Sequence, residues 1–413
     1  MSLGLLKDLD VFDNASDEIS NMLDTMTMRR YSGAHVEIFE RGIVRETVTH
    51  VDIKSMYPMV MAIFNLSPET IKLVSLKPYT GQYIFSPGYI EVPDERLDKQ
   101  VCISISPEDG VTRKAMLRFF EMRQQIRREG GPLADSRQQG VKLIMNAIYG
   151  YNGMEYARYG SFLVAIICTA TGRFIINLVL GWLKSKGLRP LEVDTDGVYV
   201  RGTFDLAELL EFVRSKFYQF PLAGMLNIDS STYEGMIIVK MKNYVLRNKG
   251  KNVFTGSGFH GRNIPHIAEL ALEDFVEALF TGGDLNETWA GCVARLVGLR
   301  VQDFEMCVDM NKDPEEYEET TMYAKLYAQL PEAEWGDEIR YVKTVDGYVP
   351  LGVKTEEELL ASLDPKYYET RLKSVIERLL VPLLGTNRDI DIFYEATIKK
   401  KKRERKNKIC MTT

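Results

Sequence analysis

Two short acidic segments contain the residues best placed to do chemistry. Asp52 ends a β-rich run (43–53), and Asp194 and Asp196 lie between two alternating runs that indicate a hairpin. If these strands are neighbours, three carboxylates converge on one point. Such a cluster needs cations, because buried carboxylates are costly without them. It would suit phosphoryl transfer assisted by two divalent ions.

Each aspartate taken alone has a simpler interpretation, as the cap of a strand or turn. The inventory of other ligands limits the kind of metal. The chain has five cysteines without a C-x-x-C pair, and four histidines without metal-ligand spacing. Oxygen ligands are therefore expected, and these favour Mg²⁺ or Mn²⁺ over zinc.

Cations on two predicted helices form a second group. Residues 111–129 predict an amphipathic helix that ends at a Gly-Gly-Pro break, and a second helix is expected from about 135 to 149, stopped at Gly150. Arg123 and Arg127 are four residues apart on the first helix. Guanidinium groups match phosphate oxygens, so one face of this helix is suited to a triphosphate.

The second helix supplies a complementary face. Lys142, Asn146 and Tyr149 are spaced by four and three residues, which places them on one side of a helix. A hairpin presenting Arg123 and Lys142 would form a triphosphate clamp. The alternative is ordinary solvated helix charge.

Five longer patterns occur in the order found in family B DNA polymerases, and the chain resembles that family. DIKSMYP (52–58) resembles motif A, KLIMNAIYG (142–150) matches motif B at every specified position, and VDTDGVYV (193–200) resembles motif C. KMKNY (240–244) is similar to the element that grips the primer strand. YSGA (31–34) matches the Y-x-G-G/A element near the template.

Further segments extend the resemblance over roughly residues 31–384. GFHGRNIP (258–265) resembles the segment leading into the family's thumb, and GDEIRYV (336–342) and LDPKYY (363–368) resemble thumb elements. Only about 30 residues precede the Y-x-G element. Members with proofreading carry a large N-terminal exonuclease region, so no intrinsic proofreading is expected from this chain.

The resemblance implies a set of metal ligands. Asp52 and Asp196 would be the principal ligands of two Mg²⁺ ions, with Mn²⁺ as a possible substitute. Asp194 would complete the catalytic cluster, and the backbone carbonyl of Ile53 would be a further ligand.

It also implies nucleotide and DNA contacts. The expected nucleotide-binding residues are Ser55, Met56, Tyr57, Arg123, Arg127, Lys142, Asn146 and Tyr149. The expected DNA-binding residues are Tyr31, Gly33, Gly150, Lys240, Lys242, Tyr244 and Arg262. Tyr57 would exclude ribonucleotides by filling the place of a 2′-hydroxyl; its alternative is a buried core tyrosine. Lys242 and Tyr244 are expected on one strand, pointing the same way.

Some positions depart from the family's usual residues. Gly197 replaces the serine of motif C, Met56 and Met59 replace leucine and serine in motif A, and Asn243 replaces a basic residue beside Lys242. None of these changes removes a carboxylate.

The predicted fold is α+β, a right-hand polymerase fold. It would have a mixed or antiparallel palm sheet with helices on one face, short helical-hairpin fingers and a helical thumb. Two helices are expected across 161–184, strands across 233–247, and helices over 265–280 and 366–384. The expected divisions are a lead-in (1–30), palm (31–110), fingers (111–150), palm again (151–262), thumb (263–398) and a basic tail (399–413).

Composition agrees with an ordinary globular protein. The 413 residues are 45% hydrophobic and 27% charged, with a net charge of −6. That acidic balance weakens a nucleic-acid interpretation unless positive charge gathers locally. The tail KKKKRERKNK (399–408) is either a solvated end or a nonspecific DNA contact. No spanning helix is expected, and the scattered cysteines favour a cytoplasmic, intracellular location.

Three functions are compatible with these observations. The first is a DNA polymerase that uses primer-template DNA and deoxynucleoside triphosphates, with a separate exonuclease or clamp subunit possible and no membrane partner. The second is a catalytically weak or inactive polymerase fold that binds DNA or a partner. The third is a metal-dependent nuclease, which would leave the face of Lys142, Asn146 and Tyr149 without a role.

Overall fold

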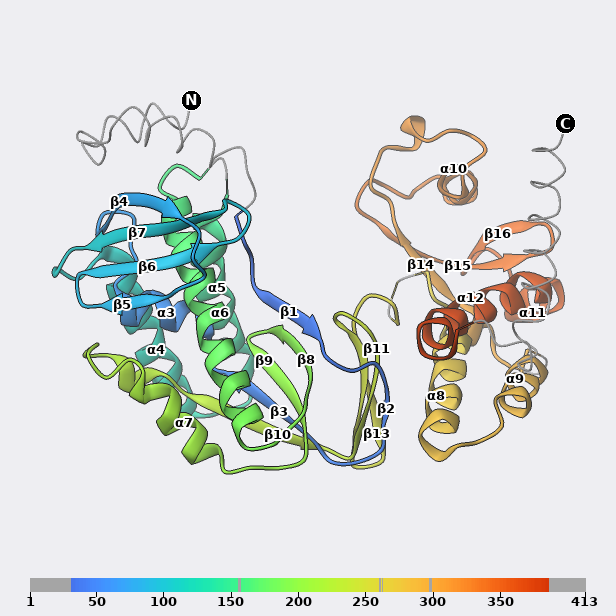
Figure 1. Cartoon of the computed structure of the whole chain (residues 1–413). Helices are drawn as coiled ribbons and strands as arrows, with labels where there is room; N and C mark the ends of the chain where they lie inside the picture. Colours follow the sequence, from blue (N-terminus) through green and yellow to red (C-terminus); the bar gives the residue numbers. More distant parts are fainter. Residues whose placement is uncertain (1–30, 155–156, 260, 262, 297–298, 386–413) are drawn as a thin grey trace, which may run out of the picture. The chain divides into compact units, whose positions relative to one another are not determined.

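The computed structural model describes residues 31–154, 157–259, 261, 263–296 and 299–385 (Figure 1). These form two compact units. Unit 1 comprises 31–39 and 47–232, and unit 2 comprises 40–46 and 233–385. The chain thus passes between the units three times. The expected lead-in (1–30) and basic tail (399–413) lie outside the described residues.

Unit 1 is built on a five-stranded sheet with the order β1-β8-β9-β3-β10. Its strands are β1 (His35–Ile38), β3 (Val48–Ile53), β8 (Pro190–Thr195), β9 (Gly197–Arg201) and β10 (Ile228–Tyr233). The pairs β1–β8, β8–β9 and β3–β9 are antiparallel. The hairpin predicted around Asp194 and Asp196 is confirmed, and Asp52 lies on the strand beside it.

One face of this sheet is apolar, and helices cover it. The helices of unit 1 are α3 (Met56–Phe64), α4 (Val111–Glu129), α5 (Ala134–Asn152), α6 (Phe162–Ser185), α7 (Leu206–Ser215) and the 3-10 turn η1 (Ala223–Met225). Val51, Val193 and Val198 lie in one cross-strand row and are at most 1% exposed. Because neighbouring strand residues point to opposite faces, the residues on either side of them lie on the other face.

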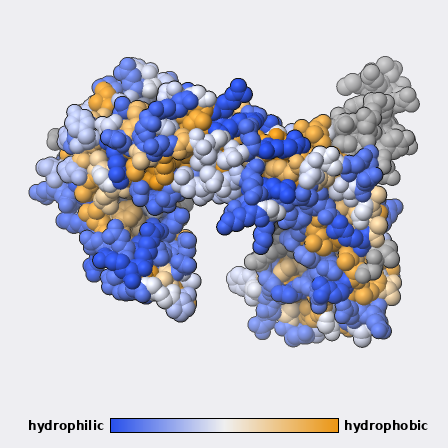
Figure 2. All heavy atoms as spheres, turned by 90° about the horizontal axis from the view of Figure 1, so that it is seen from below, coloured by the Kyte–Doolittle hydropathy of each residue, from blue (hydrophilic) through white to orange (hydrophobic). Residues whose placement is uncertain are grey.

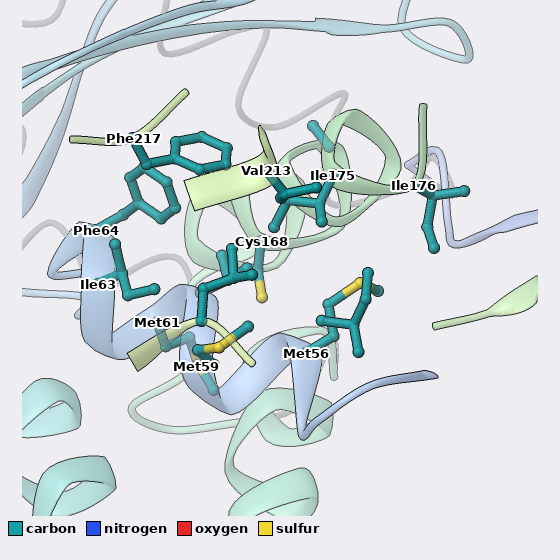
Figure 3. Close-up of a cluster of buried hydrophobic side chains, with 14 of the residues drawn as sticks. Met56, Met59, Met61, Ile63, Phe64, Cys168, Ile175, Ile176, Val213 and Phe217 are labelled. Carbon is teal, nitrogen blue, oxygen red and sulfur yellow. The ribbon is translucent and has the colours of Figure 1, made fainter. Parts of the chain in front are cut away.

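The core beneath the sheet is formed largely by α3, α6 and the segment around α7. Figure 3 shows Met59 and Met61 of α3 close to Cys168 of α6, and Phe64 close to Phe217. The rings of Phe64 and Phe217 meet edge-on, with centroids 5.4 Å apart. This packing fixes α3, and with it the chain that follows Asp52.

α6 is a single helix, so the expectation of two helices across 161–184 is wrong. Ser161 caps it by accepting a hydrogen bond from the Val164 amide (3.4 Å). The helix is apolar on all sides, a pattern typical of a core helix. By length and composition it could cross a membrane, but 78% of its most apolar window is buried inside the fold.

A second sheet in unit 1 was not predicted. It has the order β4-β7-β6-β5, formed by β4 (Ile71–Pro78), β5 (Ile84–Ser86), β6 (Tyr89–Asp94) and β7 (Lys99–Ile105). Pro78 and Pro93 lie within its strands, and proline weakens the sequence signal of a strand.

α4 and α5 form the predicted helical hairpin. α4 follows Gly110, where a β-carbon would lie 2.4 Å from the Ser67 hydroxyl, and it ends at Gly130 with φ +64°. α5 continues through Gly150 to Asn152, so the predicted stop at Gly150 is wrong. Glycine lowers helix propensity but does not end a helix that is packed elsewhere along its length.

Unit 2 has two sheets and its own core. The first has the order β13-β12-β11-β2, formed by β2 (Gly42–Val44), β11 (Gly235–Lys240), β12 (Asn243–Asn248) and β13 (Lys251–Thr255). The second is formed by β14 (Met306–Asp309), β15 (Glu338–Thr344) and β16 (Gly347–Pro350). The helices are α8 (His266–Thr281), α9 (Leu285–Ala294), η2 (Val301–Phe304), η3 (Pro314–Glu316), α10 (Met322–Tyr327), α11 (Glu356–Ser362) and α12 (Pro365–Leu384).

Two expectations change here. The β-rich run 43–53 is divided, because β2 pairs with β11 in unit 2 whereas β3 pairs with β9 in unit 1. The region predicted as a helical thumb also contains the β14-β15-β16 sheet. On the face that Figure 2 shows, hydrophilic residues cover most of the surface of each unit, with smaller apolar patches between them.

Candidate active site

Carboxylates gather on the face of the five-stranded sheet opposite the core. Gly197 pairs with Asp52 on one side and with Asp194 on the other, so the three positions form one cross-strand row. Residues paired in this way project from the same face. We call Asp52, Gly197 and Asp194 the acid row. The predicted convergence of Asp52 and Asp194 is therefore confirmed at the level of strand register.

Asp196 lies in the turn beside this row. Its amide donates to the Asp194 carbonyl (2.8 Å), and its carbonyl accepts from the Ile53 amide (2.9 Å). Between them Thr195 has φ +66°, which with the i to i+2 hydrogen bond makes a strained γ-turn. A positive φ in a β-branched residue costs about 1–3 kcal/mol, and strained residues of this kind cluster at functional sites.

The carboxylates act on one another's charge. Burial and the neighbouring Asp52 raise the pKa of Asp196 to about 6, while Lys142 acts in the opposite direction. Burial lowers the pKa of His50 on β3, and the charges of Asp52 and Asp194 oppose that effect. Like charges held together in a partly buried site are the electrostatic condition that a cation would relieve.

The donor chemistry fits a hard divalent cation, because carboxylate oxygens are what the acid row and its turn offer. Among the residues that the structure describes, no group of three or more His, Cys, Asp or Glu is already gathered as a metal-binding set. Asp52, Asp194 and Asp196 are the residues here that could supply carboxylate oxygens to such a cation.

Motif A continues from the acid row into α3. Ser55 precedes the helix with a left-handed backbone (φ +48°), and its hydroxyl accepts a hydrogen bond from Arg123 of α4 (3.0 Å). Burial, then the charge of Arg127, lowers the pKa of Arg123. Arg123 is thus fixed beside the N-terminus of α3, where amides and a guanidinium both favour an anion.

Aromatic rings of motifs A and B meet on the other side. Tyr57 of α3 stacks on Tyr149 of α5, with ring centroids 4.3 Å apart. Burial raises the pKa of both hydroxyls, so both remain neutral. A β-carbon at Gly172 of α6 would lie 3.0 Å from the Tyr57 ring, and this close approach holds the ring toward Tyr149.

Comparison with known families agrees with this geometry. The model of DNA polymerase family B matches residues 10–199, which contain motifs A and B and the acidic turn of motif C. The chain is a relative of the family B DNA polymerases. The resemblance inferred from the motifs is confirmed.

Individual family B relatives give the extent of the likeness. DNA polymerase 1 of Pyrococcus abyssi is 27% identical over 270 residues, covering 62% of this chain. The DNA polymerase of Archaeoglobus fulgidus is 26% identical over 373 residues, covering 84% of this chain and 44% of the relative. The match to the Pyrococcus protein covers 33% of that protein, so this chain spans about a third of its length.

A solved structure shows the same fold. The family B DNA polymerase from the hyperthermophilic archaeon Pyrobaculum calidifontis superposes with a TM-score of 0.58 at 20% sequence identity. The match covers 85% of this chain and 47% of that protein. This likeness concerns the fold, a mixed architecture of helices and antiparallel sheets.

In this chain, the Y-x-G element (31–34) lies against the end of motif B. A β-carbon at Gly153, just after α5, would lie 2.5 Å from the Tyr31 hydroxyl, so Tyr31 reaches the end of the helix. Asp94, fully buried, accepts hydrogen bonds from the Ser32 amide (3.1 Å) and the Ser32 hydroxyl (3.1 Å). The element is therefore tied to the second sheet of unit 1.

Arg173 of α6 is a further support that sequence reasoning missed. It donates to the carbonyls of Ser32 (2.7 Å), Gly33 (2.7 Å) and Pro93 (3.2 Å). A usable signal was present, because Arg173 is the one charged residue among 162–183, in an otherwise apolar helix. A charge inside such a helix needs partners, and here these partners are the Y-x-G backbone.

We predict that Arg173→Ala lowers the free energy of unfolding of unit 1 by about 2–4 kcal/mol, since it leaves three carbonyls without a charged donor. The measurement is urea unfolding followed by the fluorescence of Trp182, with Trp289 and Trp335 replaced by Phe. Arg137→Ala removes an exposed arginine that lies 3.6 Å from Glu129, and it should change stability by less than about 0.5 kcal/mol. Equal effects of both variants would contradict the assignment.

The structure of this chain places the other predicted residues as follows. Arg127 is exposed and donates to Gln138 (2.6 Å), Asn146 is exposed on α5, and the Met56 side chain is buried in the core. Gly33 and Gly150 have open space where a β-carbon would be. Packing inside the protein therefore does not require glycine at either position.

The KMKNY segment (240–244) lies in unit 2, and one expectation about it is wrong. Lys242 lies in the turn between β11 and β12 with φ +58°, whereas Tyr244 lies on β12 and is 5% exposed. The two side chains therefore do not share a strand face. Lys240 is exposed at the end of β11, and Arg262 lies outside the described residues.

Asn243 has a structural role that the sequence did not suggest. Its side chain donates to the Met241 carbonyl (3.0 Å) and accepts from the Gly258 amide (2.8 Å). The amide side chain thus joins the β11–β12 turn to the chain around 256–258, a link that a longer basic side chain would not reproduce.

Proposed function

We propose that this chain is a template-directed DNA polymerase that adds deoxynucleoside triphosphates to a primer 3′-hydroxyl, working on DNA inside the cell. The observation that carries the proposal is the acid row with Asp196 in its strained turn, on the face of the sheet opposite the core and beside Lys142. The names of its relatives support the same reaction.

Asp52 and Asp196 would be the principal ligands of two Mg²⁺ ions, with Asp194 and the Ile53 carbonyl completing the site. When bound, such ions lower the pKa of an attacking hydroxyl and neutralise the charge of the phosphates. The chain supplies fixed carboxylates on a rigid sheet, so the main contributions of the protein are positioning and charge compensation.

The incoming triphosphate would lie between motif A and the helical hairpin. Arg123 is held at the N-terminus of α3 by Ser55, and Lys142 acts electrostatically on Asp196. These two cations are the proposed phosphate ligands, with the amides around Ser55 and Met56 as further donors. Arg127 would have to leave Gln138 to join them.

The base pair and the template would lie along α5. Asn146 and Tyr149 share one face of that helix, and open space at Gly33 and Gly150 leaves room for a sugar-phosphate backbone to approach. Tyr31 contacts the same region. In unit 2 the exposed Lys240 and Lys242 are proposed contacts to the primer-template backbone, and Tyr244 would support them from the core.

The experiment that tests this function is single-nucleotide extension of a labelled hairpin primer-template, with each deoxynucleotide separately, in Mg²⁺ and in Mn²⁺. Addition directed by the template base is expected. Binding of the hairpin without addition in either metal would instead support an inactive polymerase fold. Loss of terminal nucleotides without addition would support a nuclease.

We predict that Tyr57→Ala lowers the preference for deoxynucleotides over ribonucleotides by at least about tenfold, a change of about 1.4 kcal/mol. The ring stacked on Tyr149 would fill the place of the 2′-hydroxyl, so Tyr57→Phe should keep the preference. Tyr218→Ala, at an 84% exposed tyrosine of unit 1, is a further control. The ratio of kcat/KM values for the two nucleotides is measured, and an unchanged ratio in Tyr57→Ala would contradict the role.

A further inference from the structure

A second row of side chains lies directly behind the acid row. Tyr199 of β9 pairs with His50 of β3 on one side and with Glu192 of β8 on the other. These positions are two residues from Gly197, Asp52 and Asp194 on their respective strands, so both rows project from the same face. We call His50, Tyr199 and Glu192 the second row. Glu192 is fully buried, and Tyr199 is 4% exposed.

His50 reaches from the second row into the acid row. Its ring stacks on Tyr199, with centroids 4.2 Å apart and planes 12° apart. A β-carbon built at Gly197 would lie 2.3 Å from His50 Nε2 and 3.2 Å from Cδ2. The imidazole therefore occupies the room that a side chain at position 197 would need, between Asp52 and Asp194.

This contact accounts for the glycine in motif C. Gly197 has no positive φ that would require glycine, unlike Gly202 just after the end of β9, so the His50 ring is the constraint on its size. A buried strand residue opposite a stacked ring cannot shift cheaply, because interiors are close-packed. The space between these strands therefore holds either the His50 ring or a side chain at position 197, but not both.

We propose that His50 is a positioning residue for the acid row and that Gly197 is its obligatory partner, the imidazole replacing the side chain that usually stands at 197. The expected effect on metal affinity rests on the proposed function, because it assumes that Asp52 and Asp194 hold a metal ion. The ring braces the strand ends that carry Asp52 and Asp194 by packing, so the carboxylates keep their spacing. Groups that orient metal ligands from behind typically contribute 10–100-fold to metal affinity.

The pairing predicts a specific pattern of substitutions. His50→Ala removes the brace, and Gly197→Ser inserts atoms into the ring's volume, so each alone should weaken Mn²⁺ binding by about tenfold or more. His50→Ala with Gly197→Ser returns a side chain to the vacated space. The double variant should bind Mn²⁺ within about threefold of the wild type, far from the product of the two single effects.

The test measures Mn²⁺ affinity of the full chain by calorimetry, without DNA or nucleotide, and thermal unfolding of the four proteins in EDTA. Gly181→Ser is the matched control for the glycine, because open space surrounds Gly181. His266→Ala is the control for the histidine, because His266 is exposed. Both controls should match the wild type.

Single variants within about threefold of the wild type, or a double variant that loses as much as the two singles combined, would overturn the proposal. If Gly197→Ser does not fold, recovery of folding in the double variant supports the pairing and continued failure overturns it. Thermal unfolding in EDTA reports on the pairing of His50 with Gly197 even if the wild type extends no primer. A failure of the proposed function can therefore be told apart from a failure of this pairing.

Discussion

Asp196→Asn should abolish primer extension, lowering kcat/KM by at least about 10³-fold while leaving primer-template affinity within about twofold. The substitution keeps the shape of the side chain and removes its charge. A site whose reaction depends on compensating developing charge loses most of its rate when one fixed charge is removed. DNA binding should persist, because the proposed backbone contacts lie in other parts of the chain.

The same substitution should stabilise the metal-free protein, which separates a functional loss from misfolding. The pKa of Asp196 is raised to about 6 from an ordinary value of 3.8. The folded state therefore binds its proton more tightly than the unfolded state, so stability falls as the pH rises from about 4 to about 6 and stays lower above that range. At pH 8 in EDTA, Asp196→Asn should gain about 1–3 kcal/mol, and the gain should vanish near pH 4.

Asp98→Asn is the matched control for this experiment. Asp98 is exposed, and its backbone is left-handed (φ +54°), a conformation that asparagine tolerates well. Its extension rate should equal that of the wild type. Extension by Asp196→Asn at more than about a tenth of the wild-type rate would refute the assignment of the site.

Lys142→Ala should lower kcat/KM for every deoxynucleotide by about 10²–10³-fold, the usual contribution of a fixed charge at a transferring phosphoryl group. Lys142→Arg should recover part of this loss, because the charge returns with a different geometry. Lys72→Ala, at an exposed lysine of β4, is the control and should have no effect on extension.

A pH profile distinguishes this role from a structural one. Lys142 lowers the pKa of Asp196, so its removal should raise that pKa further and move the acid limb of the rate profile to higher pH. Steady-state extension from pH 5 to 9 at limiting Mg²⁺ measures the shift. An unchanged acid limb alongside a large rate loss would place Lys142 elsewhere than beside Asp196.

Short local patterns carried most of what the sequence could predict. Asp52 and the Asp194–Asp196 turn were identifiable because a strand end and a hairpin are local features, and Lys142, Asn146 and Tyr149 because helical spacing is local. The expectation that Lys242 lies on a strand was wrong because a two-residue turn interrupts the β-rich run. The β4-β7-β6-β5 sheet was missed because Pro78 and Pro93 weaken the sequence signal of β4 and β6.

What escaped prediction depends on contacts between distant segments. The relation of His50 to Gly197 follows from the register of β3 with β9, and nothing in either motif specifies that register. The bonds from Arg173 to Ser32 and Gly33 join residues about 140 positions apart. Such residues are found by asking which charges lack a local explanation, as with the one arginine inside α6.

The position of β2 has a consequence for anyone who divides this protein into fragments. β2 is an edge strand of a sheet in unit 2, yet its residues 42–44 lie between β1 and β3 of unit 1 in the chain. A cut after Thr232 would separate β11 from β2 and leave three backbone pairings open. Exposed strand edges recruit other chains. A C-terminal fragment should therefore self-associate unless residues 40–46 are fused to it.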